Sequence, residues 1–360
     1  MKEVKLREIC RIEKGKQIDT SQLRTDSPYK YINGGIKESG YYHEYNTDSE
    51  AVLVSEGGAS CGYVNYVNEK FWCGCHCYKL TESKTLAKYL YYALKGNQDK
   101  IMELRSGAAM PNIKKEVFKN MSLLVDFDKN NQQAIVETLD CIQKAINNKT
   151  DELSSLDELV KSRFIEMFMQ KDYPKEKLDN LTLGKGEYGA ASASISFDRQ
   201  RPRYVRITDI NEDGTLNDDY VSSINVADDE YYKLGFGDFL FARMGATVGK
   251  TYAFKEGNQI YAGYLIRYKL NLEKIIPDFL FYYTKLDVYK RWVLENQSGA
   301  AQPGINAKKY GSLLIPVPPI ELQNEFAEFV KLIDKSKFIV QQQIKDLQEL
   351  LDSKMDEYFR

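Results

Sequence analysis

An internal repeat constrains this chain more than any other feature of its sequence. Ser106–Ile113 reads Ser-Gly-Ala-Ala-Met-Pro-Asn-Ile, and 192 residues later Ser298–Ile305 reads Ser-Gly-Ala-Ala-Gln-Pro-Gly-Ile. Each copy is followed by a lysine pair and then by a short apolar run, over 121–125 and 312–317, that favours a β-strand. Similarity at a fixed offset indicates repeated structural units, so we expect two similar halves.

A long helical pattern follows the repeated segment in each half. Over 135–167 and 326–358 the seam positions are spaced four and three residues apart in turn, at a constant offset of 191. Eight of ten seam positions are apolar in each copy, without glycine or proline, which favours a coiled coil. The alternative, two unrelated surface helices, leaves the shared register unexplained. The coiled-coil residues are Ile135, Leu139, Ile142, Ile146, Leu153, Leu156, Val160, Phe326, Val330, Ile333, Val340, Ile344, Leu347 and Leu351.

Weaker similarity extends the repeat upstream. Ser55–Val64 and Ala242–Thr251 share the pattern Gly-Ala-x-x-Gly, and Phe71–Leu80 and Tyr261–Leu270 both end in Tyr-Lys-Leu. Between these anchors the two halves differ strongly. We interpret the shared parts as framework and the divergent parts as determinants of specificity.

Each half reads as an α+β unit. Short β-type runs alternate with Gly, Asn and Asp, and one helix is expected in each half, over 86–104 and 277–294. Strands and helices do not alternate regularly, which argues against a doubly wound parallel sheet. The predicted domains are globular units over 1–128 and 172–320, each followed by a long helix, over 129–171 and 321–360.

Two equivalent helices in one chain can pair across an internal pseudo-two-fold axis. An axis perpendicular to the helices makes the coiled coil antiparallel, with one globular unit at each end. A helix of roughly 35–40 residues is about 50–60 Å long. Such a rod would hold two similar units a fixed distance apart, which suits the reading of two half-sites along a DNA duplex.

Composition excludes several classes of protein. Two histidines in 360 residues, His43 and His76, cannot form a three-histidine metal site. Six cysteines are too few for a disulfide scaffold of this length. The N-terminus lacks the apolar stretch of a secretion signal, and no apolar run is long enough to span a membrane. We therefore expect a cytoplasmic protein without a membrane partner.

The net charge of −2 conceals an uneven distribution. The predicted segments 1–128, 129–171, 172–320 and 321–360 carry net charges of +2, −1, 0 and −3. Acidic helices favour protein docking over DNA binding. Any DNA-binding charge must therefore gather locally on the globular units.

The combination of these motifs resembles the specificity subunit of type I restriction–modification systems, over essentially the whole chain. The resemblance rests on the duplicated Ser-Gly-x-x-x-Pro-x-Ile blocks, the Gly-Ala-x-x-Gly loops, Tyr204–Ile210 (Tyr-Val-Arg-Ile-Thr-Asp-Ile) and the helices ending at Phe168 and Phe359. It implies two target recognition domains, each reading half of a bipartite double-stranded DNA site. It also implies docking of two methyltransferase (modification) subunits, addition of restriction/translocase subunits, and no catalysis or cofactor of its own.

The strongest basic cluster lies in the second half. Arg199, Arg201, Arg203 and Arg206 fall within eight residues, and arginine grips phosphate or bonds to guanine. In a strand over 203–207, Arg203 and Arg206 would point to opposite faces. The alternative is a solvated charged loop.

The corresponding place in the first half is Tyr31–Ile36. There Asn33 would read adenine, and Gly34 and Gly35 would let the backbone approach phosphate. The alternative is a plain turn.

The glycine loops and the lysine pairs supply further candidates. Backbone amides, hydroxyls and cations in the loops would contact phosphates, whereas we interpret the Ser-Gly-Ala-Ala blocks as framework. Simple solvation is the alternative for the lysine pairs. The candidates are Gly57, Gly58, Ser60, Arg243, Gly245, Thr247, Lys250, Lys114, Lys115, Lys308 and Lys309, with Lys16, Gln17, Lys37, His76 and Lys185 completing the set.

Two motifs suggest other chemistry and fail on detail. Gly245–Thr251 resembles a phosphate-binding loop but has three residues between its glycines instead of four. Cys73, Cys75 and Cys77 lack zinc-site spacing and are predicted to alternate on one buried strand face, with His76 opposite. No metal or cofactor is therefore expected.

Two functional alternatives stay open. One is a two-headed coiled-coil adaptor that binds proteins and not DNA. The other is a specificity domain detached from a fused nuclease–methyltransferase.

Overall fold

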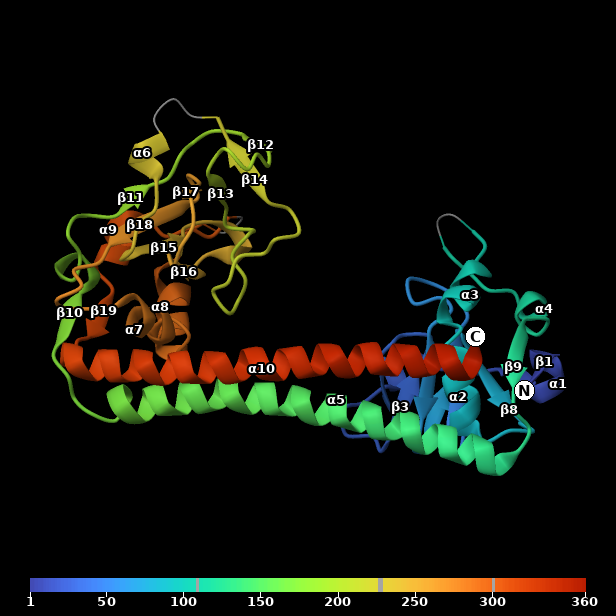
Figure 1. Cartoon of the computed structure of the whole chain (residues 1–360). Helices are drawn as coiled ribbons and strands as arrows, with labels where there is room; N and C mark the ends of the chain where they lie inside the picture. The colour runs from blue at the N-terminus through green and yellow to red at the C-terminus, as the bar shows by residue number, and fades with distance from the viewer. Residues whose placement is uncertain (108–109, 226–228, 300–301) are drawn as a thin grey trace. The chain divides into compact units, whose positions relative to one another are not determined.

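The computed structural model of the chain describes residues 1–107, 110–225, 229–299 and 302–360 (Figure 1). It forms two compact units. The first contains residues 1–152 and 340–360, and the second contains residues 153–339. No helix among the described residues is long and apolar enough to cross a membrane.

The first unit is built from three small sheets. The strands are β1 (Lys2–Lys5), β2 (Arg11–Lys14), β3 (Tyr29–Ile32), β4 (Gly40–Tyr42), β5 (Ala51–Ser55), β6 (Val64–Val67), β7 (Phe71–Cys73), β8 (Cys77–Thr81) and β9 (Ser122–Val125). Their orders are β2-β8-β5-β6, β4-β3-β7 and β1-β9. Only the β3–β7 pair is parallel among the described pairs of this unit. The antiparallel pair β1–β9 joins the first strand of the unit to its last strand.

Short helices cover these sheets. They are α1 (Leu6–Ile9), a 3₁₀ turn at Thr20–Gln22, α2 (Ala87–Lys95), α3 (Gln98–Glu103) and α4 (Lys115–Phe118). The expectation of one helix over 86–104 is wrong, because α2 ends at Lys95 and α3 begins at Gln98. The side-chain amide of buried Asn97 donates to the carbonyl of Ala93 at 2.9 Å. This local bond competes with helix continuation.

The second unit repeats the topology of the first. Its strands are β10 (Lys175–Lys177), β11 (Glu187–Tyr188), β12 (Ser194–Ser196), β13 (Arg203–Val205), β14 (Ser222–Ile224), β15 (Asp238–Ala242), β16 (Thr251–Ala253), β17 (Gln259–Tyr261), β18 (Leu265–Lys269) and β19 (Leu314–Pro316). The sheet orders are β11-β18-β15-β16, β12-β14-β13-β17 and β10-β19. The pair β13–β17 is parallel, as β3–β7 is in the first unit.

The helices of the second unit follow the same plan. They are α6 (Asp229–Tyr232), α7 (Pro277–Tyr283), α8 (Asp287–Asn296) and α9 (Ala307–Gly311), with 3₁₀ turns at Leu178–Asn180 and Gly245–Thr247. The single helix expected over 277–294 is also divided in two. The Thr284 hydroxyl bonds to the Phe281 carbonyl at 2.7 Å and contacts the Thr251 hydroxyl at 2.8 Å, which holds the chain out of helix geometry.

Two long helices complete the fold and confirm the heptad pattern. They are α5 (Lys129–Phe164), continued by a π-helical turn over Ile165–Met169, and α10 (Ile320–Phe359). In the first unit the start of α5 shares a core with the end of α10. In the second unit Phe164, at the end of α5, packs on Phe326, near the start of α10, with ring centroids 5.2 Å apart. The two helices therefore run antiparallel, as expected.

The predicted seam faces these cores. All of its residues are buried except Leu153, Leu156, Ile344 and Leu347, which are half-buried. Two of the four cations in the seam, Arg163 and Lys337, pair with carboxylates of the facing helix: Arg163 with Glu325 and Lys337 with Asp157. The other two, Lys149 and Lys354, pair within their own helices, with Glu152 and Glu357.

The predicted strand over the cysteine segment is wrong. β7 ends at Cys73 and β8 begins at Cys77, so Cys75 lies in the turn between them. A Cβ at Gly74 would come within 2.3 Å of Asn33 Oδ1, so only glycine fits this tight turn. Cys73 and Cys77 are buried, whereas Cys75 is half-buried. The described residues contain no group of three potential metal ligands from His, Cys, Asp or Glu.

The sequence alignment of the repeat, which matched Phe71–Leu80 with Tyr261–Leu270, differs by two residues from the equivalence that the structure shows. Ser55 pairs with Cys77, and its counterpart Ala242 pairs with Leu265. Cys77 of β8 is therefore equivalent to Leu265 of β18, whereas alignment of the shared Tyr-Lys-Leu would make it equivalent to the residue two positions later. A shift of two preserves the alternation of side chains between faces, so the sequence pattern could not detect it.

Candidate nucleic-acid interface

Four loops meet at one end of the sheets in the first unit. They follow β2, β3 and β5 and connect β7 to β8, and we call residues 15–17, 33–35, 56–58 and 74–76 the first loop cluster. Backbone hydrogen bonds hold the loops together. These bonds run from Gly15 N to Cys77 O (3.1 Å), Lys16 N to Cys73 O (2.9 Å), Gly74 N to Ile32 O (2.8 Å) and Glu56 N to His76 O (2.8 Å).

The second unit has the same arrangement. Residues 189–191, 206–208, 243–245 and 262–264 form the second loop cluster. Its bonds occupy equivalent positions: Gly189 N to Leu265 O (3.2 Å), Ala190 N to Tyr261 O (2.9 Å), Ala262 N to Val205 O (2.9 Å) and Arg243 N to Tyr264 O (3.0 Å). One backbone frame thus presents two different sets of side chains.

The bonds define which side chains are equivalent. Asn33 in the first cluster corresponds to Arg206 in the second, and His76 corresponds to Tyr264. Glu56 corresponds to Arg243, because each donates its amide to the equivalent turn residue. Neutral or acidic groups in one unit therefore stand where the other unit carries arginine.

The described parts of the Ser-Gly-Ala-Ala blocks support the glycine loops. Ser106 and Asn112 exchange two backbone bonds of 2.9 Å, and Ser298 and Gly304 form the same bridge. Gly58 N then donates to Pro111 O at 3.0 Å, as Gly245 N does to Pro303 O at 2.9 Å. Framework is the interpretation that these contacts favour. The alanines of the two blocks, Ala108, Ala109, Ala300 and Ala301, lie outside the described residues.

Several candidates of the first unit are exposed in or near its loop cluster. Lys16, Gln17, Lys37 and His76 are exposed, and Gly57, Gly58 and Ser60 are half-buried. The Gln17 side chain accepts a hydrogen bond from the Cys75 thiol at 2.8 Å.

Other candidates of the first unit already have protein partners or lie elsewhere. Gly34 is buried and donates its amide to Cys77 Sγ at 2.9 Å, so that amide is not available to phosphate. Gly35 is half-buried next to it. The Asn33 side-chain oxygen accepts from His76 N at 3.1 Å, which leaves its amide nitrogen as the group that could read a base. Lys114 and Lys115 are exposed at the start of α4.

The arginine cluster of the second unit is largely ion-paired. Arg201 lies 3.4 Å from Asp198, and Arg203 pairs with Asp218. Arg206 donates to both oxygens of Asp209, at 2.8 and 3.1 Å. Arg199 is exposed.

The expectation that Arg203 and Arg206 point to opposite strand faces is wrong. β13 ends at Val205, so the alternation stops before Arg206. Both side chains reach the segment 217–220 instead: Arg203 donates to the carbonyl of Asn217, and Arg206 to that of Tyr220.

The cations of the second glycine loop have unequal environments. The guanidinium of Arg243 lies over the Tyr188 ring, 4.7 Å from its centroid. Lys250 forms an ion pair of 2.9 Å with Glu212, and this hydrogen bond lowers the pKa of the Glu212 carboxyl. Gly245 and Thr247 form a 3₁₀ turn that leads to strand β16, not to the helix that a phosphate-binding loop requires.

The remaining lysine candidates also differ. Lys308 is exposed, whereas Lys309 is half-buried and donates to the Asn296 carbonyl at 2.7 Å, at the end of α8. Lys185 is exposed in the segment before β11, alongside the far end of β18. It therefore lies away from the second loop cluster.

The second loop cluster surrounds a pocket of about 720 Å³. Tyr204 supports its wall, because the Tyr204 hydroxyl donates to Ala190 O at 2.7 Å and contacts Ser192 O at 3.1 Å. Burial raises the pKa of Tyr204, so the hydroxyl stays protonated and able to donate. The pocket is lined by Ala190, Ala191, Ser192, Ser194, Tyr204, Arg206, Ile207, Thr208, Arg243, Ala262, Gly263 and Tyr264.

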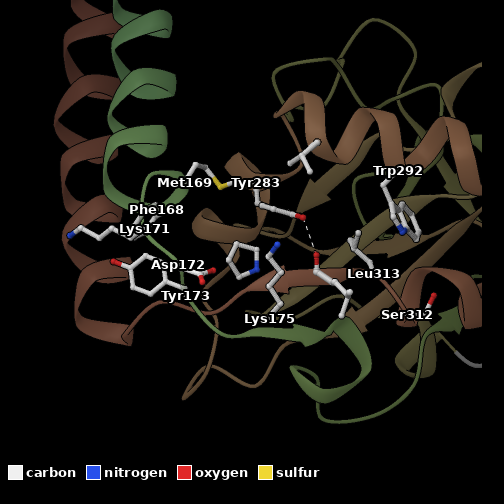
Figure 2. A pocket seen from close by; sticks show the side chains of 13 residues that line it. Phe168, Met169, Lys171, Asp172, Tyr173, Lys175, Tyr283, Trp292, Ser312 and Leu313 are labelled. Carbon is white, nitrogen blue, oxygen red and sulfur yellow. Dashed lines mark hydrogen bonds between the residues drawn. The ribbon is translucent and has the colours of Figure 1, made fainter.

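A second hollow of the same unit, of about 390 Å³, lies where the end of α5 leads into β10 (Figure 2). Figure 2 shows Tyr283 directed toward the Leu314 carbonyl, to which its hydroxyl donates at 2.9 Å. The described residues of its wall include Lys171, Tyr173 and Trp292 but none of the predicted DNA contacts. This hollow is separate from the loop cluster.

The sequence pattern did not indicate Glu56, Tyr188 or Tyr264. It also missed Gly15 and Gly189, whose signal is a glycine directly after the second strand of each half. A Cβ would meet a backbone carbonyl oxygen at 2.2 Å at Gly15 and at 2.4 Å at Gly189. The two glycines therefore permit the close backbone approach on which both clusters depend.

Known proteins share this sequence and this fold. A family model described as the type I restriction modification DNA specificity domain matches residues 1–156 and 178–349. A putative type I specificity subunit of Mycoplasma pneumoniae is 25% identical over 97% of this chain and 93% of its own length. The specificity subunit of the Escherichia coli type I restriction enzyme EcoDI is 23% identical over 96% of this chain and 84% of its own.

Solved structures agree at the level of the fold. The crystal structure of a type I restriction–modification S subunit from M. genitalium matches with a TM-score of 0.63 and 19% identity, over 100% of this chain and 96% of that one. The family match covers both halves of the repeat. The chain therefore belongs to the type I restriction–modification DNA specificity family: it is a specificity subunit, itself non-catalytic, that determines which DNA target is recognised.

Proposed function

We propose that each loop cluster reads one half of a bipartite, asymmetric DNA site. The two target recognition domains would be the segments 1–128 and 172–320. The observation that carries this proposal is the repeated backbone frame with exchanged side chains, Asn33 for Arg206 and Glu56 for Arg243. Equivalent frames would approach the duplex alike, and different side chains would select different bases.

The long helices, over 129–171 and 321–360, would set the distance between the half-sites. Each is a continuous helix, of 36 residues in α5 and 40 in α10. Continuous helices with a packed seam resist bending. A fixed number of base pairs between the half-sites is therefore expected.

The same helices would dock two methyltransferase subunits, to which restriction/translocase subunits would be added in the cytoplasm. Leu332, Phe338 and Ile339 of α10 are 62%, 69% and 57% exposed, which leaves apolar surface in the second unit. Exposed apolar patches mark protein-binding surfaces. The net negative charge of both helix segments disfavours DNA there.

A binding experiment with the methyltransferase complex tests the proposal. The complex is incubated with a library of random duplexes, the bound fraction is sequenced, and binding is repeated at increasing salt. We expect enrichment of two short motifs separated by a constant spacer, and affinity that falls steeply as salt rises. Equal affinity for all sequences would contradict the proposal. If the complex bound none of the duplexes, the result would favour the alternative of a coiled-coil adaptor that binds only proteins.

A further inference from the structure

One pair of equivalent positions differs sharply in chemistry between the two loop clusters. In the first unit Lys14 lies 2.7 Å from the Glu56 carboxylate, and the Tyr78 hydroxyl donates to the same carboxylate at 3.0 Å. In the second unit the equivalents of Lys14 and Glu56 are Tyr188 and Arg243, with the guanidinium stacked over the ring. The Lys14–Glu56 ion pair of the first unit is thus replaced in the second by a cation–π contact between Arg243 and Tyr188.

Small side chains open the pocket beside Arg243. Ala190 and Ala191 stand where the first unit has Lys16 and Gln17, and Gly263 stands where it has Cys75. In the first unit the side chains of Gln17 and Cys75 are hydrogen-bonded to each other. The corresponding space in the second unit is part of the 720 Å³ pocket.

Arg243 differs from the other arginine of the pocket wall. The Arg206 guanidinium donates hydrogen bonds to Asp209 and to the Tyr220 carbonyl. Among the described residues no carboxylate pairs with the Arg243 guanidinium, and the one hydrogen bond that this group makes to the protein, to the Gly263 carbonyl, is long at 3.4 Å. Its planar group therefore retains most of its donors.

The position of Arg243 is nevertheless fixed. Its amide donates to the Tyr264 carbonyl at 3.0 Å, and its carbonyl accepts from Ile305 N at 2.9 Å. Its aromatic support is fixed as well, because the Tyr188 hydroxyl accepts from Ala307 N at 3.2 Å. A donor fork held on a rigid frame loses little conformational freedom when it binds.

We propose that Arg243 is a specificity-determining residue that reads a guanine in the half-site of the second unit, with Tyr188 as its positioning residue. The proposal rests on the proposed function above. Guanine presents two acceptors, O6 and N7, in the major groove, and arginine matches them with two parallel donors. At the equivalent position of the first unit, Glu56 is 8% exposed, and its carboxylate is bonded to Lys14 and to the Tyr78 hydroxyl. The first unit therefore does not read guanine at this position.

Target mapping with variant complexes tests this assignment. Arg243→Ala, Arg243→Lys and Tyr188→Leu are each assembled with the methyltransferase subunit, and modified sites are sequenced in random duplex libraries. Arg291→Ala, which removes an exposed arginine of α8 outside the pocket, is the matched control. For Arg243→Ala we expect guanine preference at one position of one half-site to fall about ten- to a hundred-fold. The other half-site and the spacer should not change.

The two further variants separate reading from folding. Arg243→Lys keeps the charge but loses the planar fork, so it should also relax that position. Tyr188→Leu should weaken guanine discrimination less than Arg243→Ala and at the same position. Thermal melting of each variant close to wild type shows that the second unit is folded.

Other outcomes of the target mapping would contradict either the role of Arg243 or the proposed function. Uniform weakening across all sequences, with a salt slope smaller by about one, would make Arg243 a phosphate contact and overturn the inference. An unchanged target would overturn it as well. A wild-type complex without any sequence preference would instead overturn the proposed function, so the two failures are distinguishable.

Discussion

At the scale of single residues, function depends on which groups the fold leaves unpaired. The sequence offered four arginines between 199 and 206 as the strongest DNA-binding cluster. The structure pairs three of them with protein groups. Arg243 was one candidate among several in the sequence, yet its environment is the more suitable for base reading. Ion pairing depends on which carboxylate arrives from elsewhere in the chain, and no local pattern encodes that.

At this scale, a substitution of Gly189 tests the close backbone approach in the second loop cluster. Gly189→Ala should destabilise the second unit by about 1–3 kcal/mol, because the added methyl group overlaps backbone that cannot move aside. Its Cβ would lie 2.4 Å from the carbonyl oxygens of Tyr261 and Ala262. Gly184→Ala is the matched control, since a Cβ there meets nothing within 4 Å. Thermal or denaturant unfolding measures the difference, and equal stability of the two variants would show that the close approach is unimportant.

At the scale of elements, the repeat is more exact in the structure than in the sequence. Gln132 of α5 and Gln323 of α10 are both fully buried and separated by the same offset of 191 as the seam. Gln132 accepts from Leu86 N at 2.8 Å, and Gln323 accepts from Ile276 N at 3.1 Å. Each glutamine thus holds the start of a short helix, α2 or α7, against its long helix. Neither residue stood out in the sequence, because polar residues at helix starts are common.

Replacing either glutamine should loosen its own unit. Gln132→Ala and Gln323→Ala leave a backbone amide without its partner, which costs about 1–3 kcal/mol. Gln133→Ala and Asn324→Ala, at the exposed neighbouring positions, are the controls. Hydrogen exchange should show faster exchange of the Leu86 amide in the first variant and of the Ile276 amide in the second. Unchanged exchange would mean that other contacts hold these helix starts.

At the scale of the whole molecule, the proposed division of labour makes the long helices a measuring device. The heptad seam predicted the two long helices, since a sustained apolar period is a property of sequence alone, and the internal pseudo-two-fold axis predicted their antiparallel direction. The domain boundaries at 128, 171 and 320 remain predictions. The structure groups the end of α10 with the first unit and the end of α5 with the second.

Lengthening the coiled coil should lengthen the DNA target. One heptad inserted after Leu153 and one at the matching position, Ile344, keeps the seam in register. At about 1.5 Å per residue the helices grow by about 10 Å, or roughly three base pairs of spacer. Methylome sequencing of cells that carry the variant complex measures the spacer. A heptad inserted in only one helix is the control and should abolish modification, whereas an unchanged spacer in the double insertion would refute the ruler.

The sequence by itself determined the duplication, the α+β class and the two antiparallel helices, because repeats and apolar periods are local and survive comparison of the two halves. It also brought most loop candidates to light. Only the tertiary structure decided which residues of β8 and β18 are equivalent in the two halves, the division of the short helices, and the side chains that share each loop cluster. Those features depend on backbone pairing and on partners distant in the chain. A two-residue shift or a distant carboxylate leaves the local pattern unchanged and still alters which groups are free to meet DNA.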